Sequence, residues 1–266
     1  MTQQHTDRPA AIADVMALSA IVWVAAATLH EGMGHGLACW AMGGVPTAWS
    51  TFHFECGRQA MSIAEWRVVT GAGTMVNIGL MALGWVWWRR ADTAGGRLTA
   101  WSMFVVNGLT SFGYLIFSAA FGIGDWNAAG VMAGVADASL ARVVLAVFGI
   151  AGYYTIVRAS AKMLSQILNG PSIVADARRL SVTIWATTGI VSLVAALAAG
   201  AGWRSTLGAS IGVALGGNAG MLSIARFMVP SATSRMLLMG YNWPLRGAAI
   251  IVVAAFTAIL GPGVSL

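Results

Sequence analysis

The chain has 266 residues, of which 58% are hydrophobic and only 9% are charged. Soluble domains carry about 25% charged residues, so this composition excludes a protein whose whole surface faces water. The net charge of +6 comes from basic residues scattered at the ends of apolar runs, which is typical of membrane topology signals and excludes a basic face for nucleic acid. The sequence predicts an integral membrane protein with lipid as its main partner.

Seven apolar segments predict an all-α fold, a polytopic bundle of transmembrane helices. Several of them reach the roughly 20 residues that a bilayer-spanning helix needs. A polar leader, residues 1–11, precedes them and lacks the features of a signal peptide. Three segments form a core over residues 12–130, and four further helices follow over residues 131–266. The predicted spans are residues 12–42, 66–88, 98–123, 140–156, 182–201, 207–228 and 248–260, the last of them short unless it begins before Arg246.

The basic residues between the segments predict the orientation in the membrane. With a cytoplasmic N-terminus, eleven Lys and Arg residues lie on the inside and four on the outside. Cytoplasmic loops carry an excess of these residues. We therefore expect a cytoplasmic N-terminus, in a protein of the bacterial inner membrane.

The longest polar stretch, residues 43–65, follows the first segment. Polar and aromatic side chains alternate over residues 51–54, which predicts a short strand or hairpin. At membrane depth the backbone of such a hairpin must find its partners within the protein or in water. Cys39 and Cys56 stand in different contexts and give no framework for a disulfide-based fold.

Glycine recurs at every fourth position of the sixth segment, and such a pattern lets helix backbones approach closely. One interpretation is a homodimer interface. The other, which we favour, is ordinary helix packing inside the bundle. The glycines are Gly208, Gly212, Gly216 and Gly220.

The first segment carries the sequence His-Glu-Gly-Met-Gly-His at residues 30–35, deep in the predicted bilayer. Zinc peptidases use His-Glu-x-x-His on a helix, where two histidines bind the metal and the glutamate is the general base. Here the spacing is one residue longer, and on a regular helix His30 and His35 would point about 140° apart. A π-helical bulge would bring them together, and Gly32 and Gly34 lower the energy of irregular backbone.

His30 and His35 are therefore the predicted ligands of a Zn²⁺ ion, with Glu31 as the catalytic base. Ionisable side chains in a membrane interior are functional candidates by default, because they are costly to bury there. A second assignment stays open. Glu31 and His35, four residues apart, would be the ligands, and His30 would lie outside the ligand set.

A metal bound by two histidines needs a further ligand and an open position for water. Asp125 ends the third segment on the same side of the membrane as the deep half of the first, and is the best candidate. His53 and Cys56 are weaker ones. In the second segment, Gly73 would allow close approach to the first helix. Asn77 would hydrogen-bond a substrate backbone or an oxyanion, or else make a single polar packing contact.

In this order, these features resemble the intramembrane metalloproteases of the site-2 protease type, over about residues 20–130. That family carries a zinc motif on one transmembrane helix, a small-residue and asparagine motif on the next, and a ligand aspartate near a glycine on a third. The resemblance implies a metalloprotease-like core over residues 12–130. It also implies the roles of the site residues. The metal ligands would be His30, His35 and Asp125, and the catalytic residues would be Glu31 and Asn77.

The chain departs from that family in three ways. The histidine spacing is longer by one residue, as in the H-E-x-x-G-H motif of the soluble dipeptidyl peptidase III group. The family's N-x-x-P approach to the aspartate is replaced by Phe-Ser-Ala-Ala at residues 117–120. The family's site usually faces the cytoplasm, whereas the basic residues place this one toward the other side.

The resemblance implies a membrane-embedded, zinc-dependent endopeptidase. Its substrate would be a transmembrane or membrane-proximal protein, cleaved within or near the bilayer by metal-activated water. The alternative is a non-catalytic membrane protein of the same ancestry that binds a metal or a partner helix. A transporter is less well supported, because the segments, apart from Asp125 and the histidine motif of the first one, lack midplane charges and paired broken helices.

Overall fold

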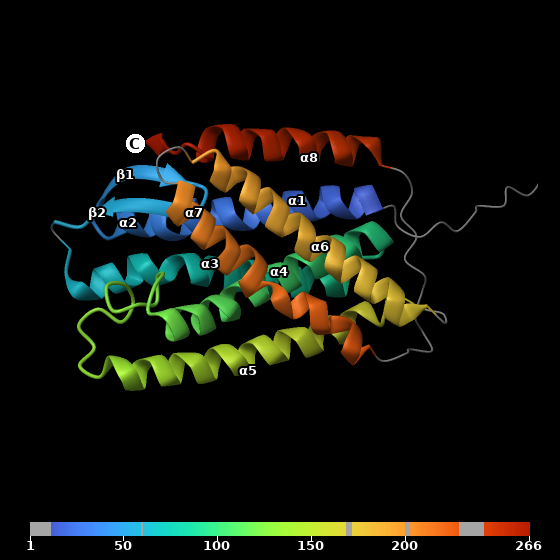
Figure 1. The fold of residues 1–266 in the computed structure, drawn as a ribbon, viewed down its shortest axis with the longest axis horizontal. Helices are drawn as coiled ribbons and strands as arrows, with labels where there is room; N and C mark the ends of the chain where they lie inside the picture. The colour runs from blue at the N-terminus through green and yellow to red at the C-terminus, as the bar shows by residue number, and fades with distance from the viewer. Residues whose placement is uncertain (1–11, 60, 169–171, 200–202, 229–241) are drawn as a thin grey trace, which may run out of the picture.

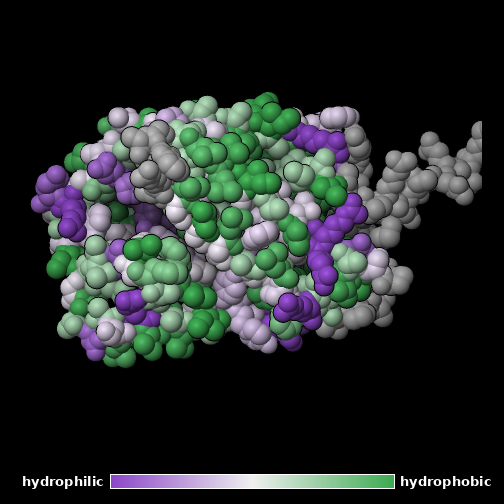
Figure 2. All heavy atoms as spheres, in the orientation of Figure 1, coloured by the Kyte–Doolittle hydropathy of each residue, from purple (hydrophilic) through white to green (hydrophobic). Residues whose placement is uncertain are grey.

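The computed structural model of the protein is a bundle of long helices, and it describes residues 12–59, 61–168, 172–199, 203–228 and 242–266. In this part of the chain, seven helices are long and apolar enough to cross a membrane, which confirms the predicted all-α fold. They run back and forth, so their turns gather at two ends of the molecule (Figure 1). Figure 2 shows hydrophobic side chains over the middle of the bundle and hydrophilic ones toward its ends. The predicted leader lies outside the described residues.

The helices and strands follow one another in chain order, with π-helical turns labelled η1, η3 and η5 and a 3₁₀-helix labelled η4. They are α1 (Ile12–Leu29), η1 (His30–Gly36), α2 (Leu37–Ala41), β1 (Val45–Ser50), β2 (His53–Gly57), α3 (Ile63–Arg90), α4 (Ala94–Phe121), α5 (Ala138–Leu164), α6 (Ile173–Leu197), α7 (Trp203–Ala209), η3 (Ser210–Gly217), η4 (Ala219–Phe227), α8 (Trp243–Ala255), η5 (Phe256–Leu260) and β3 (Val264–Ser265).

Capping residues decide where several helices begin. Ser62 and Glu65 form a reciprocal pair at the start of α3, in which each side chain accepts a hydrogen bond from the other residue's amide. The side chains of Thr93, Asp137 and Asn242 accept hydrogen bonds from amides in the first turns of α4, α5 and α8. Because these caps lie outside the apolar runs, all four helices begin before the predicted segments do. The last span is thus long enough to cross the membrane.

Basic residues lie inside the fourth and fifth spans, beyond the predicted boundaries of the apolar segments. Arg158 and Lys162 lie within α5, and Arg178 and Arg179 lie within α6. Long basic side chains extend toward the headgroups while their helix continues. The predicted fourth segment therefore ends too early, and the predicted fifth segment begins too late.

A small antiparallel sheet follows the first span, with the strand order β2-β1-β3. The predicted hairpin is confirmed, although residues 51–54 hold its turn and not its centre, since Ser50 pairs with His53. The C-terminal strand β3 pairs with β1 and is too short to leave a pattern in the sequence. The amide of Thr51 donates to the carbonyl of Leu260 at 3.0 Å, so even the turn finds a partner within the protein.

Cys39 and Cys56 form a disulfide, with their Cα atoms 6.0 Å apart. Their different contexts in the sequence did not indicate this pairing. The reason is tertiary, because β1 and β2 fold back against η1 and α2 and bring the two cysteines together. The pairing also removes Cys56 from the candidate metal ligands.

The sixth span is not one regular helix. Its α-helical start, α7, passes into η3 and then into η4, so glycines at every fourth position do not form one straight stripe. A Cβ on Gly212 would lie 2.9 Å from the ring of Phe117, and one on Gly220 would lie 2.8 Å from the ring of Tyr153. Two of the four glycines thus pack inside the bundle, and the homodimer remains a prediction.

Gly84 and Gly79 of α3 provide a matched test of the packing between α3 and α4. A Cβ on Gly84 would lie 2.7 Å from the amide nitrogen of Phe104, whereas no described atom lies within 4 Å of one on Gly79. We expect Gly84→Ala to destabilise the protein by about 1–3 kcal/mol, because overpacking forces the helices apart. Gly79→Ala should leave stability unchanged or slightly higher. Thermal unfolding in detergent measures both, and equal melting temperatures for the two variants would contradict this packing.

Candidate metal centre

The first span passes through a π-helical turn at the histidine motif. This turn, η1, continues α1 and leads directly into α2. A π-helical turn takes in one residue more than an α-helical turn, so side chains five positions apart come to the same side. The structure confirms the bulge that the longer histidine spacing requires.

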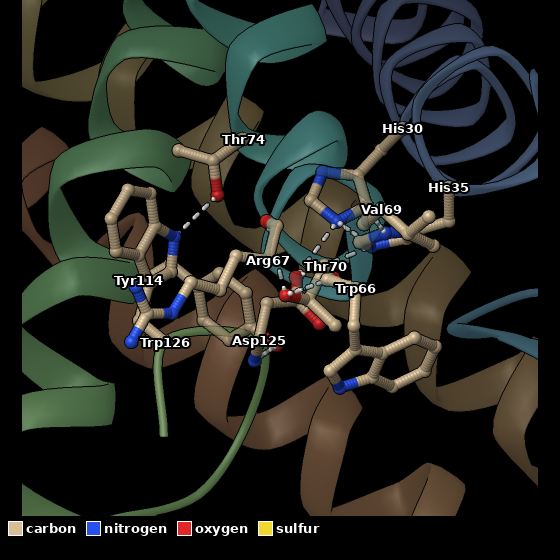
Figure 3. Close-up of polar contacts among 10 residues, drawn as sticks. All are labelled: His30, His35, Trp66, Arg67, Val69, Thr70, Thr74, Tyr114, Asp125 and Trp126. Carbon is tan, nitrogen blue, oxygen red and sulfur yellow. Dashed lines mark hydrogen bonds and ion pairs between the residues drawn. The ribbon is translucent and has the colours of Figure 1, made fainter. Parts of the chain in front are cut away.

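The side chains of His30, His35 and Asp125 converge on one point (Figure 3). The two Nε2 atoms are 3.3 Å apart, and Oδ2 of Asp125 lies 3.5 Å from that of His30 and 3.3 Å from that of His35. Ligand atoms of a tetrahedral zinc ion lie about 3.3–3.6 Å from one another when the bonds to the metal are about 2.0–2.2 Å long. The three donor atoms are thus spaced like one face of such a tetrahedron.

The electrostatics of these three groups favour a cation. Oδ2 of Asp125 is buried, and no described residue gives it a hydrogen bond of good geometry; a bound metal ion would satisfy it. Burial by itself disfavours the ionised carboxyl, but the imidazoles of His35 and His30 outweigh this effect and hold the pKa of Asp125 below its ordinary value. The carboxyl group is therefore ionised and suited to bind a metal.

A hydrogen bond to the backbone of α3 fixes the imidazole of His35. Its Nδ1 lies 2.8 Å from the carbonyl oxygen of Val69. Because a carbonyl oxygen only accepts, the proton of this bond lies on Nδ1, and Nε2, which faces Asp125 and His30, is the nitrogen that would bind a metal. α3 thereby holds this histidine in the tautomer that binds metals.

Glu31 lies beside the two histidines and is only 7% exposed. One carboxylate oxygen of Glu31 and one ring nitrogen from each of His30 and His35 lie within 4.8 Å of one another. Within the described part of the chain, these three residues form a group that could hold a metal ion. This group and the one with Asp125 share both histidines and differ in the carboxylate, whereas the second predicted assignment leaves His30 out.

Two glycines let η1 lie directly against α3. A Cβ on Gly34 would lie 2.5 Å from the Cα of Gly73, and a Cβ on Gly73 would overlap Nε2 of His30. The predicted close approach of Gly73 to the first helix is confirmed. Any side chain at either position would push the histidines away from α3.

Two further glycines of η1 pack against the hairpin. A Cβ on Gly32 would lie 2.9 Å from the ring of Trp49 in β1, and one on Gly36 would lie 2.8 Å from the ring of Phe54 in β2. Neither glycine has a positive φ. Close packing of aromatic rings, and not an unusual backbone angle, therefore requires glycine at these positions.

The loop that carries Asp125 is fixed to α3 by side-chain hydrogen bonds. The indole of Trp126 donates to the hydroxyl of Thr74 at 2.9 Å (Figure 3). The indole of Trp66 donates to the carbonyl of Ala129 at 2.6 Å. Through these contacts α3 positions the carboxylate as well as the imidazole of His35.

Tyr114 of α4 also belongs to the site, although no pattern in the sequence singles it out. Its hydroxyl accepts a hydrogen bond from the amide of Asp125 at 3.1 Å, and its ring lies 6.3 Å from that of His30. A Cβ on Gly124 would lie 2.6 Å from the same hydroxyl. No catalytic or metal-binding motif in the sequence includes this tyrosine, so only the fold reveals its role.

Two cavities adjoin at Glu31 and Tyr114. The larger has a volume of about 650 Å³ and is lined as well by His35 and Asp125. The smaller, of about 60 Å³, is lined by Asn77, whose side chain is 2% exposed and whose Oδ1 has no hydrogen-bond partner among the described residues. The site therefore has an outer chamber at the donor atoms and a small inner one at Asn77.

Metal analysis of the purified protein tests the convergence of the donor atoms. We expect about one zinc ion per chain in the wild type, and loss of bound zinc in His30→Ala, His35→Ala and Asp125→Asn, because each removes a ligand. His53→Ala is the matched control, since His53 is exposed on β2 at the edge of the larger cavity. Full zinc content in His35→Ala would contradict the site.

Comparison of the chain with models of protein families, with curated proteins and with solved structures finds no match. The resemblance to the site-2 protease type therefore rests on the residues themselves. These are the histidine motif, Gly73 and Asn77 in the next span, and Asp125 beside Gly124. Their arrangement in space is the basis on which a function can be assigned.

Proposed function

We propose that the protein is a membrane-embedded, zinc-dependent endopeptidase that cleaves a transmembrane or membrane-proximal protein within or near the bilayer. The observation that carries this proposal is the convergence of His30, His35 and Asp125 beside a buried glutamate. The two histidines and the aspartate would hold the metal. When bound, zinc supplies a Lewis acid that polarises the scissile carbonyl and lowers the pKa of water.

Glu31 is the proposed general base. Its carboxylate lies within 4.8 Å of both imidazole nitrogens, so a water at the donor atoms would be within its reach. Glu31 accepts a proton from this water as the water oxygen bonds to the carbonyl carbon. It then gives the proton to the amine as the C–N bond breaks. The distances of 3.3 and 3.5 Å from Asp125 to the imidazoles support Asp125 as the third ligand and free Glu31 for this role.

Asn77 is proposed to bind the reacting carbonyl. Its buried amide faces the inner chamber, which Glu31 also lines. Preorganised amide donors in a dry site stabilise the negative charge that develops on the carbonyl oxygen during attack. Nδ2 would donate to that oxygen, and the orphaned Oδ1 of Asn77 would accept a hydrogen bond from an amide of the substrate backbone.

The outer chamber suits a peptide in extended conformation. β2 is an edge strand of the sheet, and residues 53, 54 and 56 line this chamber. An edge strand offers unpaired backbone groups to which an extended peptide adds as a further strand. A substrate helix would therefore unwind locally and lie beside β2 when its peptide bond reaches Glu31.

The variant Glu31→Gln separates catalysis from metal binding. Glutamine keeps the size of the side chain but cannot accept the proton, so we expect cleavage to fall by about 10²–10⁴-fold with zinc content unchanged. The measurement incubates each purified protein with solubilised bacterial membrane proteins and maps new N-termini by mass spectrometry. A zinc chelator added to the wild type should give the same loss as the substitution.

The alternative, a non-catalytic protein that binds a metal or a partner helix, predicts identical N-termini with wild type and Glu31→Gln. The longer histidine spacing is the main support for that alternative. The π-helical turn η1 accommodates this spacing, so the spacing no longer argues against a metal centre.

Asn77→Ala tests the second catalytic role. We expect turnover of a peptide identified with the wild type to fall by about 10²–10³-fold, the usual effect of removing one oxyanion donor, while zinc content stays unchanged. Asn107→Ala is the matched control, because Asn107 donates to the carbonyl of Met103 within its own helix and lines neither chamber. Equal turnover of the two variants would remove Asn77 from the mechanism.

A further inference from the structure

We propose that the metal centre opens to the oxidising, non-cytoplasmic side of the membrane, and that its substrates are peptide segments exposed on that side. The direction rests on the disulfide and on the basic residues of the bundle. The nature of the substrate rests in addition on the proposed peptidase function.

The disulfide lies at the same end of the bundle as the metal centre. Cys39 is fully buried on α2, and Cys56 lines the outer chamber together with His35 and Asp125. Disulfides persist in oxidising compartments and are rare in the cytosol, where thiols are kept reduced. A disulfide in the wall of this chamber therefore places the chamber on the oxidising side.

The basic residues give the same direction independently. Helices α3 and α5 run away from the metal centre, and α4, α6 and α8 run toward it (Figure 1). Where side chains are described, the end that is far from the centre carries most of the basic residues, and cytoplasmic ends carry such an excess. The far end holds Arg89, Arg90, Arg97, Arg158, Lys162, Arg178, Arg179, Arg226 and Arg246, and the near end holds Arg58, Arg67 and Arg142.

The same disulfide holds the hairpin in place over the site. It joins α2 to β2, the edge strand whose Phe54 packs on Gly36 of η1. The wall against which an extended substrate would lie is thus covalently closed only where thiols are oxidised. A disulfide at this position therefore fits a site that opens to the oxidising side of the membrane.

This direction determines which peptide bonds reach Glu31. They belong to the non-cytoplasmic ends of transmembrane segments and to the chain that adjoins them on that side. In the site-2 protease type, by contrast, the site usually faces the cytoplasm. The chain would then combine a similar set of site residues with the opposite orientation.

Insertion of a recognition sequence for a site-specific protease tests the direction. One insertion is placed between Arg58 and Gln59, and its matched control between Asp92 and Thr93, since both turns are exposed and lie at opposite ends of the bundle. Protease added to intact bacterial spheroplasts should cut the first protein and leave the second uncut until lysis. Cutting of the second protein, or of both, in intact spheroplasts would overturn the proposal.

Alkylation of the wild type under denaturing conditions tests the chemical state of the cysteines. The chain has two of them, so the protein from membranes should gain no alkyl group before reduction and two after it. Two reactive thiols before reduction would show a reducing environment at the chamber and refute the inference.

The positions of cleaved bonds test the substrate. New N-termini that depend on Glu31 should lie in non-cytoplasmic parts of membrane proteins, and a majority in cytoplasmic parts would overturn the inference. Neither the insertion nor the alkylation depends on cleavage. If wild type and Glu31→Gln give the same N-termini, the peptidase proposal fails while the direction stands; if the second insertion is cut from outside, the direction fails whatever the activity.

Discussion

The backbone contact between Gly34 and Gly73 is the constraint on which the candidate metal centre depends. With no side chain at either position, η1 lies directly against α3. That helix then orients His35 through the carbonyl of Val69 and holds the loop of Asp125. Lipid gives no hydrophobic drive for helix association, but small residues allow such a close approach. Packing at two glycines therefore determines how close the imidazoles and the carboxylate of the site lie.

The hairpin depends on the same turn of the first span. Gly32 and Gly36 pack against aromatic rings of β1 and β2, whereas Gly34 between them packs against α3. Glycines at alternating positions thus contact two different neighbours of one helix. The last span contributes β3 to the far edge of the sheet, which leaves β2 as the edge beside the metal centre. Sheet, turn and centre are therefore packed together as one unit.

The sequence predicts the seven spans and the hairpin because composition and alternation are local properties. It also predicts the bulge at η1, because histidines five positions apart cannot face one point on a regular helix. Helix ends are less predictable, since residues such as Asp137 act as caps outside the apolar runs. The pairing of Cys39 with Cys56 and the place of Tyr114 depend on contacts between distant elements, and no spacing in the sequence carries that information.

The hydrogen bonds of Trp66 and Trp126 to the rest of the site have a mechanical consequence. They tie the Asp125 loop to α3, and α3 is itself packed on η1, so all three donor atoms belong to a single rigid body. Collective motions on the microsecond-to-millisecond scale can then carry these elements together without changing the distances between the donor atoms. In the proposed peptidase, a long polypeptide would thus enter and leave while the three donor atoms keep their spacing.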